Sequence, residues 1–160
     1  MIEIKSIQQM LYKEGSLTVV DIVKSMLKPV APFNKPRYAS GRTATSLRVE
    51  AEPELLSIYA PDYFDQLETG ISPAQSQKKN VSKLARNLYG WTFNAEIDFE
   101  NKKDRFKFSF NSAKKQQSVG SVLYRRCGQR DIYSDKVQPL VTKITEKVAS
   151  EFINVKLLSK

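Results

Sequence analysis

The stretch YASGRTATSLRVEAEPELLSIYAPDYFDQLETG, residues 38–70, decides the fold class of this chain. Apolar and polar residues alternate over 47–51, which predicts a strand. Residues 55–59 predict its partner, because the Glu-Pro-Glu sequence at 52–54 is typical of a turn. Residues 62–69 then predict a short helix. A hairpin at about 47–59 followed by helix indicates an α+β fold, in which several helices pack around a small antiparallel sheet.

The short helix over 62–69 is expected to form the heart of the fold together with the hairpin, with Tyr63 and Leu67 largely buried. Asp62, Asp65 and Glu68 recur at helical spacing within it. Paired carboxylates can hold Mg²⁺ or transfer protons, but no third ligand or phosphate-binding loop stands near them in the sequence. The favoured interpretation is that they are surface charges at a helix start, where the helix dipole stabilises acids.

Two segments of the chain resemble the tail-completion, or head–tail joining, proteins of tailed bacteriophages. In that family a helix with the pattern S/T-G-x-x-x-x-S-L/I precedes a hairpin, which leads into Y-x-x-x-L-E-x-G. The matching positions are Ser40, Gly41, Ser46, Leu47, Tyr63, Leu67, Glu68 and Gly70. The second segment, LYRRCGQRDIYSD at 123–135, is similar to the Y-R-x-G-x-R-D-I-Y-S pattern before the last helix, and includes Asp131 and Tyr133.

This resemblance implies a virion structural protein that is made in the host bacterial cytoplasm and assembled into the neck. It implies an α+β subunit present in many copies, as a ring of six or twelve that joins the portal to other neck or tail proteins. Such a ring uses heterologous contacts that close by rotation. The genome DNA would pass through its channel.

Outside the deciding stretch, the N-terminal third predicts two helices and a linker. Apolar residues at helical spacing predict a helix over 2–13 that stops at Gly15, and a second helix over 17–27. Three prolines predict that 29–38 is an extended, basic linker.

The C-terminal part predicts helices separated by one loop. Residues 70–80 are polar and without pattern, which predicts an exposed loop, and Asn80 is placed to cap a helix over 81–90. Residues 104–117 fit either a strand or a helix, and the helix is favoured. A long last helix follows, with Pro139 in its first turn, and 153–158 is expected to leave it as a strand that joins the hairpin. Together, residues 1–160 predict a single domain.

The composition argues against most classes of enzyme. The chain has no histidine and one cysteine, Cys127, so the commonest general base and the usual zinc ligands are missing. Cys127 lies beside Arg125, Arg126 and Arg130, but a bystander thiol is the favoured interpretation. We expect no catalytic residues, no metal site and no cofactor. No apolar run approaches the ~20 residues of a membrane span.

The net charge of +9, from 26 Lys and Arg against 17 Asp and Glu, favours an acidic partner such as nucleic acid. Lysine and arginine clusters neutralise phosphates without reading sequence. The candidates for contact with channel DNA or with a neighbouring ring are Lys78, Lys79, Lys83, Arg86, Lys114 and Lys115. The alternative function is a nonspecific, basic DNA-binding accessory protein.

Overall fold

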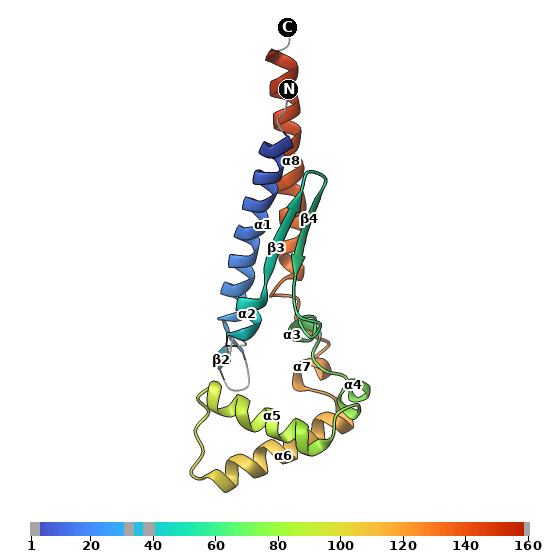
Figure 1. Cartoon of the computed structure of the whole chain (residues 1–160). Helices are drawn as coiled ribbons and strands as arrows, with labels where there is room; N and C mark the ends of the chain where they lie inside the picture. The colour runs from blue at the N-terminus through green and yellow to red at the C-terminus, as the bar shows by residue number, and fades with distance from the viewer. Residues whose placement is uncertain (1–3, 31–33, 37–40, 159–160) are drawn as a thin grey trace. The chain divides into compact units, whose positions relative to one another are not determined.

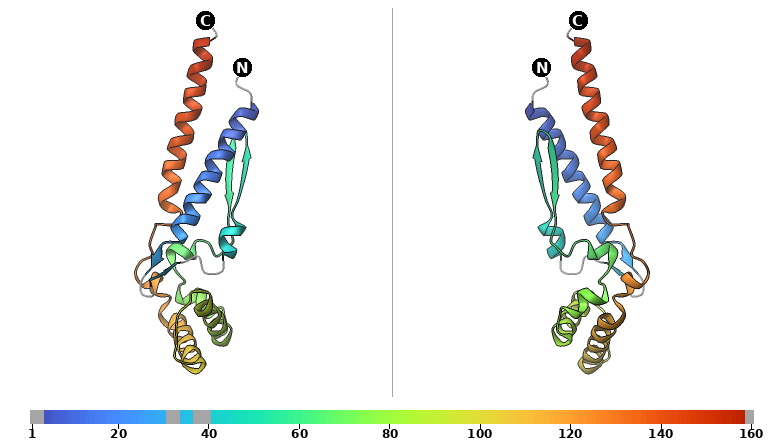
Figure 2. Two further views of the ribbon diagram at one scale, coloured as in Figure 1. Left: turned by 90° about the vertical axis from the view of Figure 1, so that its left-hand side faces the viewer. Right: turned by 90° about the vertical axis from the view of Figure 1, so that its right-hand side faces the viewer.

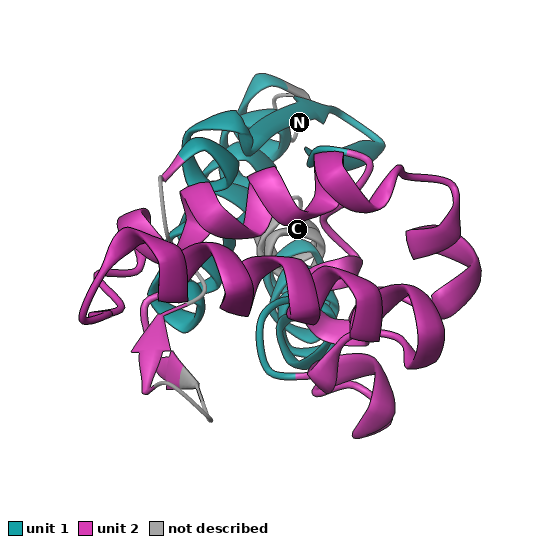
Figure 3. Ribbon diagram, turned by 90° about the horizontal axis from the view of Figure 1, so that it is seen from below, with its two compact units in different colours: residues 1–26, 42–61, 131–160 teal, residues 27–41, 62–130 magenta. Residues whose placement is uncertain are grey.

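The computed structural model describes residues 4–30, 34–36 and 41–158. It consists mostly of helices with a small antiparallel hairpin and a long C-terminal helix, so the predicted α+β class is confirmed (Figure 1). The chain divides into two compact units, shown in different colours in Figure 3. Unit 1 comprises residues 1–26, 42–61 and 131–160, and unit 2 comprises 27–41 and 62–130. The sequence-based prediction of a single domain stays a prediction.

The described residues of unit 1 form three helices and one hairpin. Its elements are α1 (Ile4–Met26), α2 (Arg42–Ser46), β3 (Arg48–Glu52), β4 (Leu55–Tyr59) and α8 (Ser134–Leu158). Strands β3 and β4 pair antiparallel, with Val49 opposite Ile58 and Glu52 opposite Leu55, as the alternating pattern predicted. Figure 2 shows the hairpin lying along α1. The short helix expected over 40–46 is present from Arg42, while Ser40 lies outside the described residues.

Helix α1 runs through Gly15, so the prediction of two helices separated at this glycine was wrong. Gly15 is buried where the hairpin lies on the helix. A β-carbon at this position would lie 2.8 Å from both Leu56 Cδ1 and Val49 Cγ1. Glycine in a helix interior costs roughly 0.5–1 kcal/mol relative to alanine, and here it allows the close approach of the hairpin.

A buried carboxylate links α1 to α8. Glu14 is only 2% exposed. It accepts a hydrogen bond from Lys147 and forms an ion pair with Lys143 at 2.7 Å. The two lysines are four residues apart, which places them on one face of α8. Their hydrogen bonds hold the pKa of Glu14 below its usual value of 4.5 against the opposing effect of burial.

Helix α8 departs from the predicted last helix in two ways. Pro139 is the sixth residue and not part of the first turn, so it lies inside the helix. The helix also continues to Leu158, so the expected strand over 153–158 does not form. The apolar interior of unit 1 includes Leu11, Ile22, Met26 and Ile132, of which Met26 and Ile132 are completely buried.

Unit 2 is built on a helical pair. Its elements are β1 (Pro29–Val30), β2 (Lys35–Pro36), α3 (Gln66–Thr69), α4 (Pro73–Gln77), α5 (Val81–Asn94), α6 (Lys102–Val119) and α7 (Val122–Arg125). Figure 1 shows α5 and α6 side by side. Their buried contact is made by Leu84, Ala85 and Ala113, with Leu88 and Phe110 packed against it. The favoured helix over 104–117 is therefore confirmed, because the helical spacing of Phe110 and Ala113 serves this contact.

Local side-chain contacts fix the starts of α5 and α6 and order the connection between these two helices. Asn80 accepts a hydrogen bond from the Ser82 amide at 2.8 Å, as predicted, and Asn101 accepts one from the Asp104 amide at 2.9 Å. Helix α5 extends to Asn94, beyond the predicted end at residue 90. In the connection, the Arg105 guanidinium lies 3.7 Å from the centroid of the Phe93 ring and donates a hydrogen bond to the Ile97 carbonyl at 3.1 Å.

The predicted loop over 70–80 is in fact structured. Ser72 and Gln75 form a reciprocal capping box at the start of α4. Ser76 in this helix is 1% exposed. The Gln117 side-chain amide donates a hydrogen bond to the Lys79 carbonyl at 2.5 Å, and the Gln77 side chain donates one to the Gln117 carbonyl at 3.3 Å.

The described part of the predicted linker over 29–38 folds back as a two-residue strand pair. Pro29 lies opposite Pro36, and Val30 lies opposite Lys35. The rest of that prediction falls on residues outside the described ranges.

Replacing Gly15 by valine tests the contact between α1 and the hairpin. We expect a loss of about 1–3 kcal/mol of unfolding free energy, because the new side chain overpacks against Leu56 and Val49. Gly90→Ala is the control, since it also fills a helical glycine but nothing lies within 4 Å of the added carbon. That variant should gain about 0.5–1 kcal/mol from helix propensity. Chemical denaturation followed by circular dichroism measures both, and a stabilised Gly15→Val variant would contradict the close packing.

Replacing Glu14 by glutamine tests the buried ion pair through its pH dependence. Because the pKa of Glu14 is lowered on folding, its contribution to stability is present above its unfolded value of about 4.5 and is lost as pH falls through the folded value. We expect Glu14→Gln to cost about 1–3 kcal/mol near pH 7 and progressively less below pH 4.5. Glu146→Gln, on the exposed face of α8, is the control. Equal losses at pH 7 and pH 3 would argue against the assignment.

Candidate functional site

The two segments that carry the family resemblance meet within unit 2. The Gln129 amide donates a hydrogen bond to the Glu68 carbonyl at 2.8 Å. Just after the first segment, the Ser121 amide donates to the Ile71 carbonyl at 2.9 Å, and the Ile71 amide donates to Ser121 Oγ at 3.0 Å. We call this contact between 68–71 and 121–129 the motif junction. It joins segments about 50 residues apart in the chain.

Two glycines make the motif junction possible. Gly70 has a φ of +76°, and a β-carbon there would collide with the Tyr124 amide nitrogen and lie 2.6 Å from Ser121 Oγ. Gly128 has a φ of +75°, and a β-carbon there would lie 2.8 Å from the Glu68 carbonyl oxygen. Both backbone conformations favour glycine over other residues. The glycines of the two patterns therefore allow the two backbones to touch.

The structure corrects the burial expected in the first segment. Helix α3 covers Gln66–Thr69 and not the whole of 62–69. Tyr63 is 45% exposed and Leu67 is half-buried, so neither is largely buried as predicted. Glu68, expected to be a surface charge, is instead 2% exposed. The hairpin belongs to unit 1 and this helix to unit 2.

Of the other residues of the family patterns, Gly41 belongs to unit 2, and Ser46, Leu47, Asp131 and Tyr133 belong to unit 1. Gly41 is buried with a φ of +75° just before α2, and Ser46 Oγ donates a hydrogen bond to the Thr43 carbonyl at 2.8 Å. Leu47 is half-buried. Asp131 and Tyr133, which precede α8, are half-buried on either side of the completely buried Ile132.

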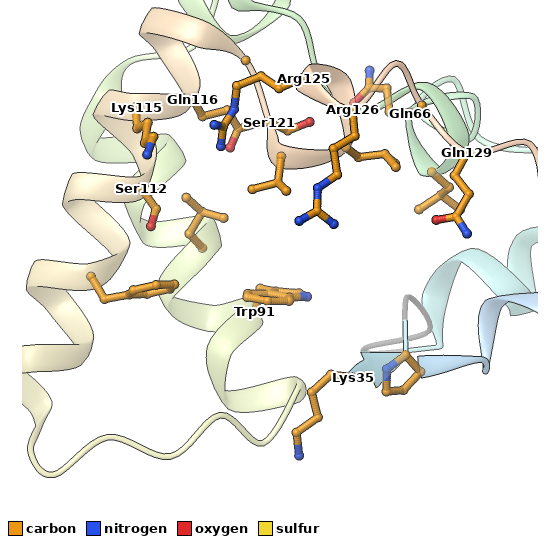
Figure 4. Close-up of a pocket in the computed structure, with 18 residues that line it drawn as sticks. Lys35, Gln66, Trp91, Ser112, Lys115, Gln116, Ser121, Arg125, Arg126 and Gln129 are labelled. Atoms are coloured by element: carbon orange, nitrogen blue, oxygen red, sulfur yellow. The ribbon is translucent and has the colours of Figure 1, made fainter. Parts of the chain in front are cut away.

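A cavity of about 710 Å³ opens beside the motif junction, entirely within unit 2 (Figure 4). We call it the junction pocket. Its apolar lining comes from both resemblance segments and from the helical pair, and includes Leu67, Leu88, Trp91, Phe108 and Leu123. The volume falls within the roughly 300–1,000 Å³ that is typical of ligand pockets.

The charged residues of the junction pocket are all basic. They are Lys35, Lys115, Arg125 and Arg126, with no acid among the lining residues. Figure 4 shows the Arg126 side chain extending toward Trp91. None of the four cations forms an ion pair with any residue that the structure describes. The pocket therefore combines an apolar interior with an unneutralised basic rim.

The basic residues singled out from the sequence are all exposed: Lys78, Lys79, Lys83, Arg86, Lys114 and Lys115. The hydrogen bonds between Gln117 and the segment 77–79 bring the first group to the same end of the helical pair as the second. Lys114 lies 4.9 Å from the centroid of the Phe110 ring. Of the six, Lys115 lines the junction pocket.

The sequence singled out Arg125 and Arg126 but did not place them beside Trp91, which lines the same pocket. A signal for this basic region was nevertheless present, because residues 69–95 and 105–130 contain no acid and eleven Lys and Arg. Cys127, between Arg126 and Gly128, is exposed with a φ of +61°.

The described residues hold no group of three or more acidic, cysteine or histidine side chains that could bind a metal ion. Helices long and apolar enough to cross a membrane are likewise absent from the part of the chain described. The expectation that the chain is not an enzyme stays a prediction.

No protein-family model, curated protein or solved structure matches the chain in the three comparisons.

Replacing Gly70 by alanine tests the motif junction. We expect a loss of at least about 2 kcal/mol, because alanine resists a left-handed φ and its β-carbon collides with the Tyr124 amide. Trp91, the only tryptophan of the chain, lies in unit 2, so the midpoint of its fluorescence change in denaturant reports the unfolding of this unit. The same substitution at Gly90 should not lower that midpoint. An unchanged midpoint for Gly70→Ala would show that the two backbones do not touch.

Proposed function

We propose that this protein is a virion structural component of a tailed bacteriophage, a ring-forming head–tail connector of the neck that joins the portal to the tail and surrounds the DNA channel. The observation that carries the proposal is the motif junction. Two sequence patterns that resemble one family, far apart in the chain, form a single contact through their own glycines. This contact gives a physical reason why the two patterns occur together in one chain.

The distribution of charge supports a subunit with two different surfaces. Unit 1 carries 10 Lys and Arg and 10 Asp and Glu, whereas unit 2 carries 16 and 7, so unit 2 accounts for the net charge of +9. Residues 94–107, around the connection between α5 and α6, carry four acids and four bases. The excess of positive charge therefore lies in the rest of unit 2. A localised positive field suits passing DNA, since phosphate contacts are nonspecific and weakened by salt.

Exposed apolar side chains on unit 1 support subunit contacts. Leu17 and Val20 of α1 are 46% and 48% exposed, and Val137 and Val141 of α8 are 53% and 51% exposed. Residues three or four apart lie on the same face of a helix. Contiguous exposed apolar patches mark surfaces that bind other proteins, and these two pairs are our candidates for subunit contacts.

The second candidate function is a nonspecific DNA-binding accessory protein. The acid-free stretches at 69–95 and 105–130 favour it, but it leaves the motif junction and the exposed apolar residues of unit 1 without a role. Light scattering after size exclusion separates the two functions, for the protein alone and mixed with the portal protein. A closed ring or a portal complex supports the connector, and a monomer that binds duplex DNA tightly supports the accessory protein.

The basic end of the helical pair should dominate any DNA binding. We expect the triple change of Lys78, Lys79 and Lys83 to alanine to weaken duplex binding and to reduce the slope of log K against log salt by up to about 2.7, since each phosphate contact contributes about 0.9. The control changes Lys102, Lys103 and Lys107, which are equally exposed and carry the same charge. Equal effects of the two variants would show that only total charge matters.

A further inference from the structure

The turn end of the hairpin, which we call the hairpin tip, carries exposed acids and an exposed apolar residue. Its sequence over 50–55 is Glu-Ala-Glu-Pro-Glu-Leu, and all three glutamates are exposed. Leu55 is 55% exposed. Glu50 lies 3.7 Å from Arg48, whereas Glu52 and Glu54 form no ion pair with any residue described. The tip thus presents two unneutralised carboxylates beside an exposed leucine.

This tip is held in one position within unit 1. The Gln8 side chain of α1 donates a hydrogen bond to the Ala51 carbonyl at 2.7 Å. The two strands are paired up to Glu52 and Leu55, on either side of the turn. An ordered turn loses less conformational freedom on binding than a flexible loop does.

The junction pocket has the complementary chemistry. Four cations and no acid lie among its lining residues, around leucine, phenylalanine and tryptophan side chains. An apolar side chain that enters it is buried, while carboxylates beside that side chain meet the basic rim. Complementary charge of this kind fixes the register of a contact and rejects wrong partners.

We propose that the hairpin tip of one copy of this chain docks in the junction pocket of a second copy. Leu55 enters the apolar interior, and Glu52 and Glu54 meet Arg125 and Arg126. Because tip and pocket are different surfaces, the contact is heterologous and repeats from copy to copy until it closes as a ring. Its role as the ring contact rests on the proposed function.

A charge-reversal experiment on the full chain tests this docking. The tip variant carries Glu52→Lys and Glu54→Lys, and the rim variant carries Arg125→Glu and Arg126→Glu. Each alone places like charges together, so we expect each to lose the oligomer in sedimentation velocity at a concentration where the unaltered protein assembles. Mixed in equal amounts, the two variants restore opposite charges at every contact of an even-numbered ring, and the oligomer should return. A chain with all four changes should assemble alone.

Matched controls separate charge placement from total charge. Glu96→Lys with Glu100→Lys makes the same change as the tip variant at exposed acids between α5 and α6, and should leave the oligomer intact. Trp91 lines the pocket, so its emission should shift on assembly of the unaltered protein and not in the rim variant. Circular dichroism checks that each variant is folded.

The outcomes distinguish the docking from the proposed function. If the unaltered protein and both reversed variants form the same ring, the docking is wrong and the connector stands. Loss of assembly without rescue on mixing also overturns the docking. A protein that stays monomeric alone and with portal overturns both. If nuclease-treated protein binds a single-stranded oligonucleotide, loses it in the rim variant and assembles regardless, the pocket is a nucleic-acid site.

Discussion

The close approach of two backbones at the motif junction is the constraint on which unit 2 depends. The chain at 68–71 touches the chain at 121–129 through main-chain hydrogen bonds, without room for a side chain at Gly70 or Gly128. This contact sets the position of α7 against α3. It thereby places Leu67 and Leu123 on the wall of one cavity, with Arg125 and Arg126 at its rim. The backbone contact at Gly70 and Gly128 thus brings the apolar wall and the basic rim of the pocket together.

The packing of unit 1 depends on two other contacts. A glycine lets the hairpin lie close to α1, and a buried carboxylate with two lysines holds α8. Removing one partner of such a buried group is costly, so the ion pair specifies which face of α8 meets α1. Unit 1 is electrically balanced overall, while its hairpin tip is acidic and unit 2 is strongly basic. This asymmetry within one chain is the physical basis for proposing contacts between unlike surfaces of neighbouring copies.

Much of the local structure could be predicted from the sequence, because the signals are local. Alternation over 47–51 predicted the first strand of the hairpin, and Asn80 marked the start of α5. For 104–117 the sequence favoured a helix but also fitted a strand, and the structure has the helix α6 there. For the candidate site, the exposed basic residues could be predicted from the sequence. The capping box at Ser72 and Gln75 was also present in the sequence, but the polar composition of 70–80 concealed it.

What the sequence by itself determined is therefore the α+β class, most helices and the excess of positive charge. Only the tertiary structure decided that Gly15 continues a helix, that Glu68 is buried and that Tyr63 is exposed. The physical reason is that these outcomes depend on what lies opposite each residue. Gly15 faces Leu56, some 40 residues away, and Glu68 meets Gln129, some 60 residues away. Local propensities do not depend on such distant partners. The junction pocket, in particular, is lined by residues on both sides of the contact between 68–71 and 121–129.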